Sequence, residues 1–160
     1  MPDLILINTP LNTMIVSSEY GKRVPPKSGA SSNHQGIDLY GNMGEGIDPI
    51  YATHSGKIIR AGMSSSLGNF VIIQDDISGM ATIYCHMHNK KFGDIYSGSP
   101  DHLRVINAGE EIGKIGKTGL PDIGVHLHME ILSEESANRI KNEGAGDSYI
   151  PGGPLSSAVF

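Results

Sequence analysis

Apolar residues along the chain occur mostly in short runs, and glycine, proline or serine separates one run from the next. Short runs of this kind, bounded by turn formers, are typical of β-strands. They fall at residues 5–7, 14–16, 36–40, 49–52, 57–59, 70–74, 81–84, 111–115 and 125–132. Turn-forming pairs stand between them, among them Ser55-Gly56, Gly68-Asn69 and Ser78-Gly79. The pattern predicts an all-β fold that is mostly antiparallel.

One segment near the C-terminus is expected to form a short helix, at residues 133–141. Ser133 could cap its N-terminus, and Glu134 and Glu135 suit a first turn, where the helix dipole favours negative charge. The tail that follows, residues 144–160, is rich in Gly, Pro and Ser and is expected to be irregular.

Length and composition agree with one globular domain. The chain has 160 residues, enough for a real core, and 38% of them are hydrophobic. The 21 glycines favour short strands and turns over a helical bundle. Because the single cysteine cannot form an internal disulfide, the fold is not expected to depend on one.

Charge and hydropathy exclude several partners and settings. The net charge is −5 without a basic face, which argues against nucleic acid, and no polybasic stretch would hold the chain on an anionic membrane. No segment is long enough to span a membrane. The apolar stretch at the N-terminus is too short for a signal peptide, so we expect export within something larger or by another route.

Histidines and carboxylates gather in three short segments, NHQGID at 33–38, YCHMH at 84–88 and HLHME at 126–130. Side chains at i and i+2 share one face of a strand. His126, His128 and Glu130 are therefore expected to project together. The same alternation groups His86 with Tyr84 and His88, and it points Cys85 away from them.

His34 and Asp38 can converge on a shared ion if Gly36 lets the chain bend toward it. Two imidazoles and one carboxylate make a common catalytic zinc set, which leaves a fourth position for water. A closed structural site would use more cysteines, and the helical H-E-x-x-H motif is absent. Single histidines are usually surface or core residues, and this is the interpretation of His54 and His102.

The three segments match the H-x-G-x-D, Y-x-H and H-L-H-F-E motifs of one known family, with Met129 in place of phenylalanine. Weaker matches follow in the right order at residues 18–23, 49–56, 68–73, 108–113 and 116–119. On these motifs, which span residues 17–132, the chain resembles the lysostaphin/LytM-type zinc metalloendopeptidases, a family that includes peptidoglycan peptidases.

The resemblance implies a compact antiparallel β-sandwich with a substrate groove, and a single peptidase domain over residues 1–160. It implies that His34, Asp38 and His128 bind Zn²⁺ and that His86 and His126 are catalytic. In that mechanism we expect His126 to take a proton from water and His86 to stabilise the oxyanion as a hydrogen-bond donor.

Two further residues have open alternatives. Tyr84 could donate a hydrogen bond at the site or simply pack, and Glu130 could orient a ligand histidine or face water as a structural residue. His88 is expected at the rim of the site.

The expected function is zinc-dependent hydrolysis of peptide bonds in the stem peptide or cross-bridge of peptidoglycan, at the bacterial cell wall. The extracellular, periplasmic and virion-associated settings, including a phage lysin, are all open. The alternative is a non-catalytic module of the same fold that binds peptidoglycan or activates a partner within a larger protein or a phage virion.

The chain departs from the family pattern at residues 121–125 and 89–104, which are longer than usual. Both segments are expected to wall the groove. The aromatic side chains of Phe92 and Tyr96 would either line that wall or pack on the domain.

Overall fold

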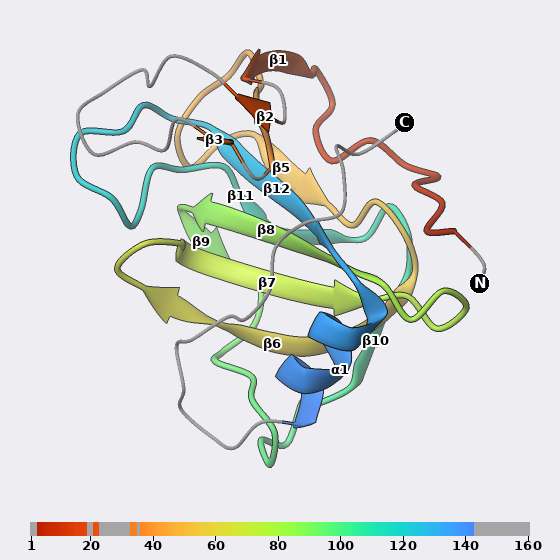
Figure 1. The fold of residues 1–160 in the computed structure, drawn as a ribbon. Helices are drawn as coiled ribbons and strands as arrows, with labels where there is room; N and C mark the ends of the chain where they lie inside the picture. Colours follow the sequence, from red (N-terminus) through yellow and green to blue (C-terminus); the bar gives the residue numbers. More distant parts are fainter. Residues whose placement is uncertain (1–2, 19–20, 23–32, 35, 143–160) are drawn as a thin grey trace.

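The computed structural model describes residues 3–18, 21–22, 33–34 and 36–142, and the large sheet within them is antiparallel throughout. The spatial order of its seven strands is β1-β4-β12-β8-β7-β6-β10 (Figure 1). Their bounds are β1 Ile15–Ser18, β4 Ile37–Tyr40, β12 Leu127–Leu132, β8 Ala81–Met87, β7 Gly68–Gln74, β6 Gly56–Ser64 and β10 Arg104–Ile106.

A small sheet of three strands has the order β5-β11-β9, and two very short strands, β2 and β3, pair separately. The bounds are β5 Pro49–Tyr51, β11 Glu111–Lys114, β9 Asn89–Lys90, β2 Gly21–Lys22 and β3 Asn33–His34. The helix α1, Glu134–Asn142, follows β12 directly. The expectation of a mostly antiparallel β fold with one short helix near the C-terminus is confirmed.

The two sheets enclose the inner cluster, a group of fully buried apolar side chains. Leu39 and Ile73 of the large sheet and Ile50 and Ile112 of the small sheet are all at 0% exposure within it. Burying each such side chain contributes about 1.5–3 kcal/mol. The sandwich is held together mainly by this layer.

The other face of the large sheet carries the outer cluster, which includes Phe70, Ile72 and Leu132 and packs against Ala137 and Ile140 of α1. The expected cap is present, because the amide of Ser136 donates to Ser133 Oγ at 3.1 Å. Since β12 leads into α1, the helix covers this face at the Leu132 end (Figure 1). The start of β12 lies at the other end of the same face.

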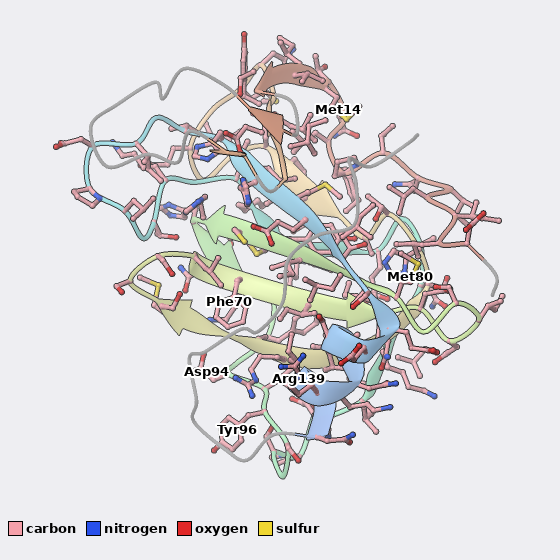
Figure 2. The ribbon with its side chains drawn as sticks, viewed as in Figure 1. Met14, Phe70, Met80, Asp94, Tyr96 and Arg139 are labelled. Carbon is pink, nitrogen blue, oxygen red and sulfur yellow. The ribbon has the colours of Figure 1, made fainter. Side chains whose placement is uncertain are left out.

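The segment between β9 and β10 runs along β6, away from β12. Ile95 is 1% exposed, and it exchanges both backbone hydrogen bonds with Ala61 of β6, each 2.8 Å long. Phe92 packs against the inner cluster, with the Arg104 guanidinium 4.6 Å from its ring centroid. Tyr96 lies beyond β6 (Figure 2). The structure thus favours packing for Phe92, and the backbone pairing of Ile95 holds this segment beside β6.

Two further expectations concern the first apolar run and the absence of a membrane-spanning segment. Residues 5–7 are not a strand, although the Ile7 and Asn8 amides both donate to the Thr53 carbonyl oxygen. No helix among the described residues is long and apolar enough to cross a membrane.

Candidate active site

Asp38 and His128 are paired residues on the neighbouring strands β4 and β12. Asp38 Oδ1 lies 2.7 Å from His128 Nδ1, and Glu130 Oε1 lies 2.9 Å from His128 Nε2. Both side chains alternate with inner-cluster residues, so they lie on the opposite face of the sheet, the one that α1 covers farther along. We call this face, around the start of β12, the site face.

The two carboxylates hold a proton on His128. Burial disfavours the imidazolium, but the hydrogen bonds to Asp38 and Glu130 outweigh burial and raise the pKa of His128 to about 9. Both ring nitrogens then donate, one to each carboxylate. Of the two interpretations of Glu130, the structure favours contact with a histidine of the site, His128.

Gly36 allows β4 and β12 to approach this closely. A Cβ atom at Gly36 would overlap the Met129 carbonyl oxygen and would lie 2.9 Å from His128 Cε1. A backbone oxygen cannot rotate away as a side chain can. The glycine of the H-x-G-x-D motif therefore lets the two strands lie this close together, which a residue with a Cβ atom would prevent.

A β-bulge places His86 on the site face. Asn69 pairs with Met87 and Val71 with Tyr84, so Cys85 and His86 together oppose Phe70. His86 has a φ of 60°, in the left-handed region.

The bulge overturns simple alternation along β8. Cys85 does not point away from the site but packs in the outer cluster, and burial, then the nearby Glu130 and Asp38 carboxylates, raise the pKa of its thiol. Tyr84 instead faces the inner cluster at 0% exposure. Its hydroxyl is bonded to Thr53, accepting from the amide at 3.0 Å and lying 2.7 Å from Oγ1. Of the two interpretations of Tyr84, its burial in the inner cluster favours packing over a hydrogen bond at the site.

His86 and His126 lie side by side, with ring centroids 4.9 Å apart. His86 Nδ1 is 2.7 Å from the Thr118 carbonyl oxygen, and His126 Nδ1 is 2.8 Å from the Gly124 carbonyl oxygen. A carbonyl oxygen only accepts, so Nδ1 carries the proton in both rings. In the neutral form, Nε2 of each ring therefore has the lone pair.

Burial sets the protonation of His86. It lowers the pKa of His86 to about 4, and the neighbouring His126 and His128 add to this effect. At neutral pH His86 is therefore an uncharged imidazole. His126 Nε2 lies 3.8 Å from Asp38 Oδ1, which joins the two histidines to the Asp38–His128 pair.

The other histidines are placed differently. His88 is exposed and lies beside Gly46. His54 is buried, with its ring bonded to Thr82 Oγ1 at 2.9 Å, and takes the core role expected for a single histidine. The backbone of His34 pairs with Gly21, and its side chain lies outside the part of the chain that the structure describes.

Among the described side chains, no group of three or more His, Cys, Asp or Glu residues is arranged to hold a metal ion. Asp38 and His128 nevertheless fit zinc in kind, because a carboxylate oxygen and an imidazole nitrogen face each other. A proton takes the position between them that a shared cation would otherwise take. His34 would have to complete the set.

Sequence patterns did not reveal Thr118 and Gly124, whose carbonyl oxygens fix the rings of His86 and His126. The only sequence feature near Thr118 was the G-x-T-G turn at residues 116–119. Because every residue has a backbone carbonyl oxygen, contacts made through these atoms cannot be identified from residue types.

Peptidase family M23 matches residues 32–140, a range that contains all three histidine segments. The chain belongs to this family. A metalloprotease of unassigned function from Buchnera aphidicola is 31% identical over 130 residues, which are 79% of this chain and 31% of that protein. This chain thus spans about a third of the length of that relative.

Solved structures of M23 proteins have the same fold. A zinc-containing peptidase from Vibrio cholerae has a TM-score of 0.63 and 26% identity, over 81% of this chain and 37% of that one. The catalytic domain of the antimicrobial peptidase lysostaphin from Staphylococcus simulans has a TM-score of 0.58 and 25% identity, over 76% of this chain and 84% of that one. The resemblance to lysostaphin-type peptidases is confirmed.

Proposed function

We propose that this chain is a zinc-dependent endopeptidase that hydrolyses peptide bonds in bacterial peptidoglycan, in the stem peptide or the cross-bridge. One observation carries the proposal. His86 and His126 meet beside the Asp38–His128 pair, and each has its Nδ1 fixed on a backbone carbonyl. Membership of a peptidase family and similarity to a zinc-containing peptidase support the same chemistry.

His34, Asp38 and His128 would hold the zinc ion. When bound, zinc polarises water and the scissile carbonyl as a Lewis acid. His128 Nδ1 must lose its proton before it can act as a ligand. Glu130, 2.9 Å from His128 Nε2, then holds the ring by accepting the remaining N–H.

His126 is the residue we assign as general base. Its Nδ1–H is donated to Gly124, which leaves the Nε2 lone pair to take a proton from water. Asp38 Oδ1, 3.8 Å from that Nε2, stabilises the imidazolium that results. The protonated ring can then give its proton to the leaving amine.

His86 takes a different role from the one its motif suggested. An uncharged ring whose Nδ1–H is already donated to Thr118 cannot donate a hydrogen bond from Nε2. We therefore propose that His86 Nε2 accepts a hydrogen bond from the attacking water and orients its lone pair toward the carbonyl carbon. With a pKa of about 4, His86 is also a weaker base than an ordinary histidine.

The setting of this activity is part of the proposal. We place the chain at the bacterial cell wall, as a single peptidase domain that works alone, within a larger protein or in a virion. Because the chain spans 31% of its Buchnera relative, the partners and location of the whole protein remain proposals.

Digestion of defined muropeptides, followed by mass spectrometry, tests the function. The zinc-loaded parent is expected to produce new peptide termini, whereas His126→Ala is expected to produce almost none. His88→Ala is the matched control, because it removes an exposed imidazole at the rim. Binding of muropeptides by the parent without cleavage would instead support the non-catalytic alternative.

A further inference from the structure

Thr118 contacts His86 and both strands of the bulge that presents it. Its carbonyl oxygen accepts from His86 Nδ1 at 2.7 Å. Its hydroxyl donates to the Met87 carbonyl oxygen at 2.7 Å and accepts from the Asn69 amide at 3.0 Å. Asn69 and Met87 are the strand pair that closes the bulge. One side chain thus joins the turn at residues 116–119 to β7 and β8.

The turn lies against the β6–β7 hairpin with no side chain between them. Gly68 has a φ of +63°, and a Cβ there would overlap the Thr118 carbonyl oxygen. Gly119 has a φ of +105°, and a Cβ there would lie 2.6 Å from the Gly68 nitrogen and 3.2 Å from His86 Nδ1. The Thr118 carbonyl can reach His86 only because both positions are glycine.

The backbone of His86 is in a conformation that other contacts must stabilise. Its φ of 60° lies in the left-handed region, which is sterically unfavourable for a residue other than glycine. Its amide donates to the Leu67 carbonyl oxygen at 2.7 Å, and its ring is held by Thr118. Both anchors are backbone carbonyl oxygens, which substitution cannot remove. The Thr118 hydroxyl, which bonds Met87 and Asn69, holds the second of them in place and can be removed by substitution.

We propose that Thr118 is a positioning residue that fixes the tautomer and the direction of the His86 ring. The hydroxyl holds the Thr118 carbonyl at His86 Nδ1, and the proton kept there leaves the Nε2 lone pair facing the site. The effect on catalysis rests on the proposed peptidase function, whereas the effect on the tautomer does not.

Thr118→Val tests this, because it removes the hydroxyl and keeps the shape. Nitrogen-15 NMR of histidine-labelled protein, with the His86 signals assigned by subtracting a His86→Gln spectrum, reports which ring nitrogen carries the proton. The parent should show His86 as the single Nδ1–H tautomer, and Thr118→Val should show a mixture. Thr118→Ser should restore the parent pattern. In the zinc-loaded enzyme kcat should fall about 10–100-fold in Thr118→Val, with KM nearly unchanged.

Thr82→Val is the control, because it removes a buried hydroxyl from β8 that is bonded to a different histidine, His54. It should leave the His86 tautomer and kcat unchanged even if its melting temperature falls as much as that of Thr118→Val. If Thr118→Val does not fold, Thr118→Ala removes the same hydroxyl without bulk and is judged by the same spectrum.

An unchanged His86 tautomer in the folded hydroxyl-free variant would overturn the proposal, as would failure of Thr118→Ser to restore it. If the parent cleaves no muropeptide but the hydroxyl-free variant shows a mixture of His86 tautomers, the positioning role is supported and only the peptidase function is contradicted.

Discussion

Asp38 Oδ1 and His128 Nδ1 lie 2.7 Å apart on paired strands, although 90 positions separate the two residues in sequence. In the metal-free protein a proton joins these atoms, because two carboxylates raise the pKa of His128 to about 9. A zinc ion bound as proposed would compete with this proton for the same nitrogen.

The metal content of variants tests the ligand set. His34→Ala, Asp38→Ala and His128→Ala should each lower zinc occupancy from about one ion per chain, because each removes one ligand. Elemental analysis of purified protein measures this, with His88→Ala as the control. Normal zinc content in all three variants would rule out the assignment.

Variants of the two histidines proposed to be catalytic should separate activity from metal binding. His126→Ala is expected to keep zinc and to lose roughly 10²–10⁴-fold in kcat, the usual contribution of an acid–base residue. His86→Ala is also expected to keep zinc and to lower kcat, because it removes the nitrogen that orients the attacking water. Steady-state kinetics at equal zinc content is the measurement. If His126→Ala loses zinc while His128→Ala keeps it, the two roles have been exchanged.

The stability of the metal-free protein should depend on pH through His128. Its folded pKa of about 9 is above the unfolded value of about 6.5, so its stabilising effect is complete below pH 6.5 and is lost as pH rises through 9. Urea unfolding in the presence of a chelator, at pH 6 and at pH 9, measures this loss. His128→Gln cannot titrate, so its stability difference from the parent should shrink toward pH 9. A difference that does not change with pH would contradict the His128 assignment.

Gly36 should be intolerant of even one methyl group. Gly36→Ala would force β4 and β12 apart at the Met129 carbonyl, as overpacking that costs about 1–3 kcal/mol of stability. It should also weaken zinc binding, since Asp38 moves with β4. Gly93→Ala is the matched control, because a Cβ at Gly93 meets nothing within 4 Å. Equal stability and equal zinc affinity in the two variants would show that neither property depends on the close approach of β4 and β12 at Gly36.

Much of the strand pattern was predictable because short apolar runs between turn formers leave few other choices. Runs at 70–74 and 81–84 lie within β7 and β8, and Ser133 caps α1 as its sequence suggested. Residues 5–7 do not form a strand, because within the described part of the chain the Ile7 amide bonds only to Thr53 and the run pairs with no strand. An apolar run does not show whether a partner strand lies beside it.

The site was predictable where the chain alternates regularly and not where it bulges. His128 and Glu130 share a face, as the i, i+2 rule requires. Along β8 the same rule grouped Tyr84 with His86, whereas the left-handed His86 divides them between two faces. That conformation depends on Leu67 and Thr118, which are distant in sequence, so the Y-x-H motif alone could not reveal it.

Hydrolysis in water enriched in oxygen-18 tests the central claim most directly. Defined muropeptides are incubated with the parent protein, with the chelated protein and with the chelated protein after zinc is restored, and the products are analysed by mass spectrometry. Zinc-dependent hydrolysis predicts one oxygen-18 atom in each new carboxyl terminus, for the parent and the zinc-restored protein only. If folded protein carrying its full zinc content released no labelled peptide from any stem or cross-bridge chemistry, the account would be contradicted.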